Sequence, residues 1–258
     1  MMRALVLKVG GVLLDTPQAM DNLLTALRHY RQQHQRQIVI VHGGGIVVDN
    51  LMKKLNLPVA KKNGLRITPS DQIDIIVGAL AGIANKTLLA KALSMQLNAV
   101  GLFLGDGNMT EAQPFDEELG HVANVTANDP TLLTQLLQAD FLPIISSIGL
   151  DKQGRLMNVN ADQAAITIAK LIDADLVMLS DVDGVLDANK QRIAQLDSTQ
   201  IAQLIADRVI TDGMIVKVNA ALEAAKDLGR GVDIANWKHP DKLTALLSGE
   251  IVGTRICP

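Results

Sequence analysis

The chain has 258 residues, of which 48% are apolar and only 2% aromatic, and its formal net charge is −3. This length allows one large domain or two small lobes on a shared sheet, and the lack of a basic field or of aromatic stacking platforms argues against nucleic-acid binding. A single cysteine (Cys257), no signal-peptide pattern and no uninterrupted apolar stretch near the roughly 20 residues of a membrane span predict a reducing, cytoplasmic location without a membrane partner.

Short β-rich runs alternate with helical periodicity along the whole chain. Strands are predicted at residues 4–7, 38–41, 100–104, 142–147, 175–179, 232–235 and 251–256. Helices are predicted from Pro17, over 46–55, from about 68 to 97 with a candidate break near Gly82, from 129, and at about 198–207 and 213–228. Residues 57–67 and 108–128 are predicted as hairpins or loops. Repeated strand–helix alternation indicates an α/β protein with a mainly parallel sheet covered on both faces.

Three local signals predict helix ends. Thr16-Pro17 is typical of an N-cap followed by proline at the first helical position. Thr68–Asp71 resembles a capping box with aspartate in place of glutamate, and Gly229 is a candidate C-terminal stop. Because no linker, repeat or low-complexity tract interrupts the pattern, we expect one domain over 1–258 that consists of two lobes on one sheet.

The standard phosphate-binding signatures are absent, since the sequence has neither G-x-x-x-x-G-K-[ST] nor a G-x-G-x-x-G after a strand. In open α/β sheets, ligands still bind beyond the carboxyl ends of the strands. The first strand is followed by Lys8, Gly10 and Gly11, where paired glycines let backbone N–H groups approach an anion and lysine adds a charge. A tight turn with a solvated lysine is the alternative interpretation.

Candidate anion-binding residues also follow the second strand. His42 precedes the three glycines 43–45, which stand before a predicted helix and are typical of an anion site. Three glycines cost conformational entropy, so a mere turn would rarely need them all. His42 itself is interpreted as a hydrogen-bonded structural residue. Arg66 offers a bidentate fork for a carboxylate or phosphate, or belongs to a solvated basic loop.

The second half of the chain holds three further polar clusters. Asn158, Asn160 and Asp162 alternate, so they can face one cavity if the segment is extended, or else cap a helix. Residues 180–185 form a polar turn at a strand end, which suits a nucleotide or is simply a turn. Lys217 lies in the first turns of a helix, an unfavourable place for a cation that hints at function unless the side chain is exposed.

Taken together, these segments resemble the amino-acid kinase superfamily and, within it, the acetylglutamate kinase family of bacterial arginine biosynthesis. The matching strings are Leu7-Lys8-Val9-Gly10-Gly11, Val41-His42-Gly43-Gly44-Gly45, Lys62-Asn63-Gly64-Leu65-Arg66-Ile67-Thr68, Asn158-Val159-Asn160-Ala161-Asp162 and Thr211-Asp212-Gly213-Met214 with Lys217. They stand in the family's order over nearly the whole chain. The glycine-rich turns are shared across the superfamily, whereas the N-G-L-R and N-V-N-A-D strings are more specific.

The resemblance implies a three-layer α/β/α sandwich around a mainly parallel sheet and transfer of the ATP γ-phosphoryl group to the γ-carboxylate of N-acetyl-L-glutamate, the second step of the acetylated route to arginine. It implies an acetylglutamate-binding lobe of about 1–174 and an ATP-binding lobe of about 175–258. The roles it carries over are Lys8 and Lys217 as transition-state stabilisers with Asp162 between them; Gly10 and Gly11 on phosphate; Gly44, Gly45, Arg66, Asn158 and Asn160 on the substrate; and Asp181, Val182, Asp183, Gly184, Val185, Leu186, Val209, Ile210 and Thr211 on ATP.

The same resemblance implies Mg-ATP as co-substrate, with Mg²⁺ carried by ATP, and a homodimer. Arginine-inhibited hexamers of the family have an extra N-terminal helix, which this sequence lacks, so arginine feedback is not expected. Asp183 is a small departure, because it adds a second negative charge to the proposed nucleotide turn, where such a charge is not obviously helpful near ATP. Its carboxylate could face solvent or approach the metal.

The reaction fits the residue inventory. A substrate carboxylate with a pKa of about 4.3 is already ionised near neutrality, so no general base is required. The difficulty is to bring the substrate carboxylate close to the negatively charged ATP phosphates. Two lysines, backbone N–H groups and Mg²⁺ would neutralise this charge. Three alternatives stay open: a kinase for glutamate, aspartate or carbamate, a non-catalytic ligand sensor on the same fold, and a nicotinamide-dependent dehydrogenase, which would lack its glycine fingerprint.

Overall fold

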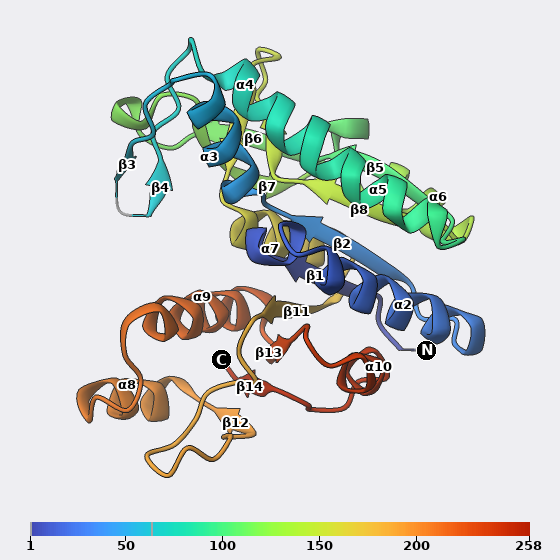
Figure 1. The fold of residues 1–258 in the computed structure, drawn as a ribbon, viewed down its shortest axis with the longest axis vertical. Coiled ribbons are helices and arrows are strands. Elements are labelled where there is room, and N and C mark those ends of the chain that lie inside the picture. Colours follow the sequence, from blue (N-terminus) through green and yellow to red (C-terminus); the bar gives the residue numbers. More distant parts are fainter. Residues whose placement is uncertain (1, 63) are drawn as a thin grey trace.

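An eight-stranded sheet runs through the whole molecule (Figure 1). This computed structural model describes residues 2–62 and 64–258. The strand order is β12-β14-β13-β11-β1-β2-β8-β5, and every neighbouring pair is parallel except β13 with β14. The strands are β1 (Leu5–Val9), β2 (Ile38–His42), β5 (Ala99–Phe103), β8 (Leu142–Ser146), β11 (Asp175–Ser180), β12 (Gln195–Leu196), β13 (Val232–Asn236) and β14 (Thr254–Ile256). The predicted mainly parallel α/β sheet is confirmed.

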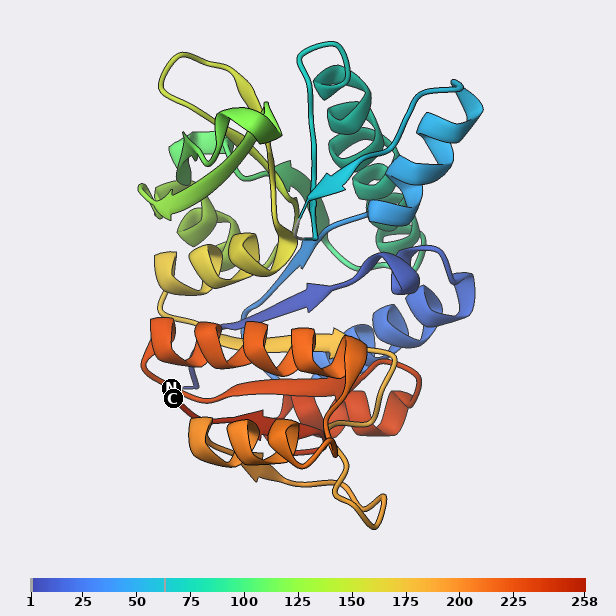
Figure 2. The ribbon, with the colours of Figure 1, turned by 90° about the vertical axis from the view of Figure 1, so that its left-hand side faces the viewer.

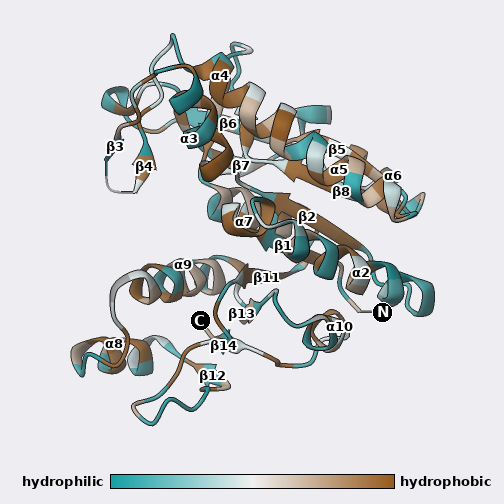
Figure 3. Cartoon of the chain, in the orientation of Figure 1, coloured by the Kyte–Doolittle hydropathy of each residue, from teal (hydrophilic) through white to brown (hydrophobic). Residues whose placement is uncertain are grey.

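Helices cover both faces of this sheet and complete the three layers. One face carries α1 (Gly11–Leu14), α2 (Pro17–Gln33), α5 (Asn85–Ser94) and α10 (Pro240–Leu247). The other carries α6 (Thr131–Gln138), α7 (Ala161–Leu171), α8 (Ser198–Ala206) and α9 (Asp212–Leu228). Figure 2 shows α7 in yellow and α9 in orange on the same side of the strands. Colouring by hydropathy shows the central strand β2 as apolar and α2 as largely hydrophilic (Figure 3), as expected for a buried strand under an amphipathic helix.

The side chains of strand β1 alternate between the two faces of the sheet. Leu5, Leu7 and Val9 pack in the α2 core, while Val6 packs in the α7 and α9 core. Lys8 shares the face of Val6. Its ammonium group is therefore directed toward α7 and α9, at the carboxyl end of the strand.

A smaller assembly stands beyond the carboxyl ends of β2 and β8. It contains α3 (Gly45–Lys54), the hairpin of β3 (Lys61–Lys62) and β4 (Leu65–Arg66), and a second sheet of order β6-β7-β10-β9. The strands of that sheet are β6 (Thr110–Pro114), β7 (Val122–Ala127), β9 (Ile148–Leu150) and β10 (Leu156–Val159). The 3-10 turn η2 (Asp106–Asn108) precedes β6, and the 3-10 turn η3 (Glu117–Leu119) connects β6 to β7. The hairpins predicted at 57–67 and 108–128 are confirmed, while Asn63 of the matching string lies outside the described residues.

The helices differ from the predictions in three details: one cap, one break and one additional helix. The capping box predicted at 68–71 is wrong: α4 (Ile73–Val77) begins after Gln72 without a side-chain cap, and Thr68 instead donates its hydroxyl to the Arg66 carbonyl at 3.1 Å. Thr68 forms a β-bridge with Gly120, so its backbone is engaged as a strand. The helix does not break near Gly82 but continues through the π-helical segment η1 (Gly78–Ala84) into α5. Helix α10 was not predicted, whereas the stop at Gly229, with φ of 63°, is confirmed.

The continuous helix Ile73–Ser94 has 22 residues and a mean hydropathy of 1.6 in its most apolar window, so by length and composition alone it could cross a membrane. Core helices of soluble proteins pass the same test, and 39% of that window is buried inside the protein. The helix packs on β5 and β8. Polar residues such as Asp74, Asn85 and Lys86 interrupt it, which is why the sequence shows no unbroken apolar span.

Candidate functional site

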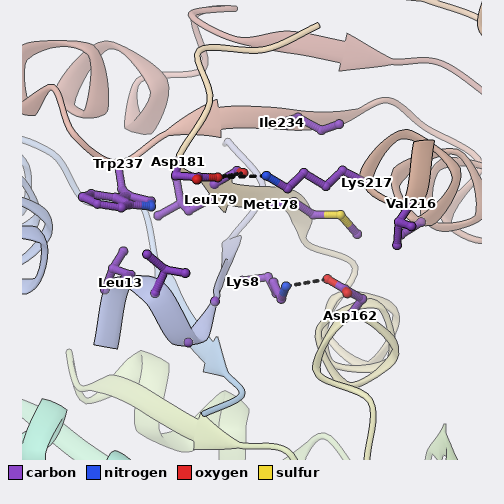
Figure 4. Close-up of a pocket in the computed structure, with 15 residues that line it drawn as sticks. Lys8, Leu13, Asp162, Met178, Leu179, Asp181, Val216, Lys217, Ile234 and Trp237 are labelled. Carbon is purple, nitrogen blue, oxygen red and sulfur yellow. Dashed lines mark hydrogen bonds and ion pairs between the residues drawn. The ribbon is translucent and has the colours of Figure 1, made fainter. Parts of the chain in front are cut away.

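A cavity of about 340 Å³ opens between β1 and α7 on one side and β11 and α9 on the other. Two ion pairs lie in it (Figure 4). The Lys8 ammonium is 2.8 Å from an Asp162 carboxylate oxygen, and the Lys217 ammonium is 2.8 Å from an Asp181 carboxylate oxygen. This first cavity therefore brings together Lys8 and Lys217 from opposite sides, the two lysines that the family resemblance placed at one site.

The turn after β1 belongs to the same cavity. Gly10 and Gly11 line it, and α1 begins at Gly11. A side chain at Gly11 would lie 3.5 Å from the Gly45 backbone nitrogen, so the two glycine turns stand next to each other. The structure thus brings the first and second predicted anion-binding turns together, although they are more than 30 residues apart in sequence.

The expectation that Asp162 lies between the two lysines is not met. Asp162 is in the first turn of α7 and pairs with Lys8, whereas Lys217 reaches from α9 to Asp181 at the end of β11. The hydrogen bond from Lys217 is the main reason that the pKa of Asp181 is lowered. Each lysine therefore has its own carboxylate, and Asp181, predicted only as a nucleotide contact, is the residue that holds Lys217.

A second cavity of about 190 Å³ lies beside the first, under the β3–β4 hairpin. All five predicted substrate residues line it, namely Gly44, Gly45, Arg66, Asn158 and Asn160. The Arg66 side chain is only 8% exposed, and its guanidinium forms an ion pair with Asp49 on α3 and donates to the Gly45 carbonyl at 3.4 Å. The Asn158 amide donates to the Thr68 hydroxyl at 3.1 Å. A buried cation and amide groups make this cavity suitable for a small carboxylate.

The alternating residues 158, 160 and 162 do not face a single cavity. The extended segment ends at Val159, and α7 begins at Ala161. Asn160 is the N-cap, and its side-chain oxygen accepts hydrogen bonds from the Asp162 and Gln163 backbone nitrogens at 2.8 and 3.3 Å. Helical geometry then directs Asp162 into the first cavity, while Asn158 and Asn160 line the second. The alternative prediction, that this segment caps a helix, is confirmed for Asn160.

A third cavity of about 500 Å³ contains the whole predicted nucleotide set. Its members are Asp181, Val182, Asp183, Gly184, Val185, Leu186, Val209, Ile210 and Thr211, together with Met214, Asn236, Lys238 and His239. The two stretches are brought together because the turn after β11 lies beside the start of α9. Asp181 lines both the first and the third cavity, so the two are neighbours.

The additional charge of Asp183 is compensated by polar and cationic neighbours. The Asn236 amide donates to its carboxylate at 3.1 Å, the Lys242 ammonium is 3.5 Å away, and His239 is 3.7 Å away. Burial raises the pKa of Asp183, but these neighbours outweigh it, and the net pKa is lowered. Asp183 therefore carries a negative charge that faces the Lys242 ammonium and the Asn236 amide.

Several lining residues were missed by the sequence analysis. Asn236, Trp237, Lys238 and His239 stand at the end of β13, so inspection of that strand end would have found them. Lys238 donates to the Asp181 carbonyl at 3.0 Å. Asp49, in contrast, lies inside α3 with no motif around it, and only the fold reveals its contact with Arg66. Within the described ranges, no group of three or more His, Cys, Asp or Glu side chains is arranged to hold a metal ion.

His42 is fully buried behind the glycine turn. Burial, the main cause, lowers the pKa of its imidazole from 6.5 to about 4, and the nearby Lys86 charge acts in the same direction. The unfolded chain would bind a proton at His42 below about pH 6.5, but the folded protein only near pH 4. We therefore expect the His42 contribution to stability to be complete above pH 6.5 and to fall by up to about 3 kcal/mol between pH 6.5 and 4.

Urea unfolding at pH 7.0 and 4.5 measures this contribution when the protein is compared with the His42→Asn variant, which has no imidazole. The variant should lose less of its unfolding free energy on acidification than the unmodified protein. Equal losses in the two proteins would show that His42 does not titrate in this way.

Comparison with known proteins gives one consistent family. The model of the amino acid kinase family matches residues 3–236. Acetylglutamate kinase from Actinobacillus succinogenes is 71% identical over 257 residues, and that from Pasteurella multocida is 69% identical, each alignment covering 100% of both chains. Among solved structures, the smu.665 protein of Streptococcus mutans superposes with a TM-score of 0.80 at 29% identity and covers 98% of both chains.

Proposed function

This chain belongs to the amino acid kinase family, and we propose that it phosphorylates N-acetyl-L-glutamate with ATP to give N-acetyl-L-glutamyl 5-phosphate, the second step of arginine biosynthesis by the acetylated route. Full-length identity of 60–71% to acetylglutamate kinases supports this function. The observation that carries it within the structure is the side-by-side arrangement of the cavity around Arg66 and the cavity that contains Lys8 and Lys217.

We assign the roles from this arrangement. Arg66, Asn158 and Asn160 would bind acetylglutamate in the second cavity, with Gly44 and Gly45 along the path of the phosphoryl group. Lys8 and Lys217 would stabilise the charge on the moving phosphoryl group in the first cavity, where Gly10 and Gly11 contact phosphate. Asp162 and Asp181 would position the two lysines. In this assignment residues up to about 174 form the acetylglutamate lobe, and those from about 175 form the ATP lobe.

The nucleophile is the substrate carboxylate, which is ionised near neutrality and needs no general base. His42 is unsuited to that role because it is fully buried and has a lowered pKa. Catalysis would consist of positioning the two anions and neutralising their charge, which matches a site that contains lysines and glycine turns.

ATP would occupy the third cavity, with its adenosine part on residues 181–186 and 209–211 and its γ-phosphate directed toward Lys217 and Lys8. Mg²⁺ commonly binds to phosphates with only one or two carboxylates rather than in an all-protein cage. We propose that the ATP phosphates carry the Mg²⁺ ion. The ion would supply further positive charge at the phosphates.

We also propose a cytoplasmic homodimer. The helix Ile73–Ser94 exposes Ile83 (49%) and Leu93 (51%), two large apolar side chains that association could cover. Sedimentation equilibrium would test this, since a mass of 27.6 kDa at all micromolar concentrations would contradict the dimer.

Turnover assays with Mg-ATP and a panel of acids test the substrate. We expect N-acetyl-L-glutamate to be phosphorylated with a kcat/KM at least about 100-fold above those for glutamate, aspartate and carbamate, because a site that hydrogen-bonds a substrate group rejects analogues lacking it. Faster turnover of plain glutamate would favour another amino-acid kinase. Ligand binding without any turnover would favour a non-catalytic sensor.

A further inference from the structure

Behind the glycine turn 43–45, His42 and Asn85 form a buried hydrogen-bonded pair. Both side chains are 0% exposed. We propose that this pair is a positioning device that fixes the glycine turn for phosphoryl transfer. The proposal rests on the proposed function and adds two residues to it, neither of which contacts the substrate in our assignment.

The neighbours of Asn85 fix its orientation. Its amide nitrogen lies 2.9 Å from the Ile144 carbonyl and 3.2 Å from the Leu102 carbonyl, and it is 3.0 Å from His42 Nε2. Carbonyl oxygens only accept, so the NH₂ group must point toward them, and Lys86 donates to the amide oxygen at 3.1 Å. The amide nitrogen cannot accept a hydrogen bond, so His42 Nε2 beside it carries no hydrogen and shares one of the two N–H groups with a carbonyl. The imidazole is then neutral, with its proton on Nδ1.

The proton on Nδ1 reaches the glycine turn. His42 Nδ1 lies 2.7 Å from the Gly43 carbonyl oxygen and donates to it. The planar peptide bond joins that carbonyl to the Gly44 N–H, so a fixed carbonyl direction fixes the direction of the N–H. Gly44 is the N-cap of α3 and lines the second cavity with Gly45. The orientation of a backbone donor beside the proposed phosphoryl path thus depends on the tautomer of His42.

The main chain is shaped to seat this pair. Asn85 follows the π-helical segment η1 directly, and such segments often occur at functional sites because they rotate the residues that follow. Leu80 and Ala84 of η1 pack against Gly44, where an added Cβ would lie 2.9 Å from Leu80 Cδ2. On the other side, a Cβ at Gly101 of β5 would lie 2.3 Å from the Asn85 amide oxygen. Glycine at 101 therefore leaves the space that Asn85 occupies.

Two substitutions at His42 separate its two nitrogens. An asparagine amide can occupy the place of Nδ1 and keep the bond to the Gly43 carbonyl, whereas a glutamine amide can occupy the place of Nε2 and keep only the contact with Asn85. We expect His42→Gln to lower kcat about 100-fold, since a misplacement of about 1 Å can have this effect. His42→Asn should retain kcat within about 5-fold. The KM for ATP should change less than about 3-fold in both, because the nucleotide cavity is formed by other segments.

Urea unfolding of both variants distinguishes positioning from a purely structural role. Equal kcat in folded His42→Asn and His42→Gln, with only their stability reduced, would overturn the proposal. In the unmodified protein, ¹⁵N chemical shifts at pH 7 should show Nδ1 protonated and Nε2 unprotonated, and the opposite tautomer or a charged ring would also overturn it. These shifts require no substrate, so a failure of acetylglutamate to react would count against the proposed function and not against the hydrogen-bonded pair.

Discussion

Lys217→Met is expected to lower kcat for acetylglutamate phosphorylation by about 10³-fold while the KM for acetylglutamate stays within about 3-fold. The ammonium lies in the first cavity but not in the second, so its loss should affect the transition state and leave substrate binding intact. Removing one charge-stabilising group from a phosphoryl-transfer or oxyanion site has effects of this size. Steady-state kinetics with both substrates varied gives the two constants.

Lys226→Met is the matched control, because Lys226 is an exposed lysine in the last turn of the same helix α9. It should retain nearly full kcat. Circular dichroism should show the same unfolding midpoint for both variants within a few degrees. A fall in kcat of less than 10-fold in Lys217→Met would show that Lys217 does not stabilise the transition state, and the proposed role would then be left to Lys8.

Arg66→Met is expected to raise the KM for acetylglutamate about 100-fold, which corresponds to about 3 kcal/mol of binding. Methionine keeps much of the side-chain length but removes a nearly buried guanidinium from a cavity that would hold the substrate carboxylate. The KM for ATP should change little, because Arg66 does not line the nucleotide cavity.

Two companions sharpen this result. Arg66→Lys keeps the charge but loses the planar fork, so an intermediate KM is expected. Asp49→Asn keeps Arg66 but weakens the ion pair that holds it, and a KM raised about 10-fold would identify Asp49 as its positioning residue. An unchanged KM in Arg66→Met would place the substrate carboxylate elsewhere.

The sheet and most of the site were predictable because both follow local rules. Period-two alternation, glycine turns at strand ends and the Asn160 cap are written in neighbouring residues, and parallel strands bring their carboxyl ends to one edge. These rules pointed to Lys8, to the glycine turns and to the polar clusters at 158–162 and 180–185, whereas the place of residues 209–211 in the nucleotide set came only from the family resemblance. They did not give the pairing of Lys217 with Asp181, which depends on how α9 lies relative to β11.

Two other features were beyond sequence reasoning for a physical reason. The π-helical segment 78–84 has an ordinary apolar composition that does not distinguish it from an α-helix, so only the folded backbone shows its altered register. Asn85 reads as one polar residue in an apolar helix, and its three acceptors come from segments up to about 60 residues away. Contacts of this kind depend on the assembled tertiary structure, not on any local pattern.

The continuity of the central sheet restricts how this molecule can be divided. Strand β1 is hydrogen-bonded to β2 on one side and to β11 on the other, and Leu5, Val6 and Leu7 are at most 1% exposed. A cut before residue 175 would leave β1 as a bare apolar edge, which is a template for aggregation. The two halves therefore cannot be expressed as independent domains or exchanged between proteins as separate modules. A protein engineered to combine a different substrate specificity with a different nucleotide specificity must keep the hydrogen-bonded pair β1–β11 intact. Only the loops at the carboxyl ends of these strands can be changed.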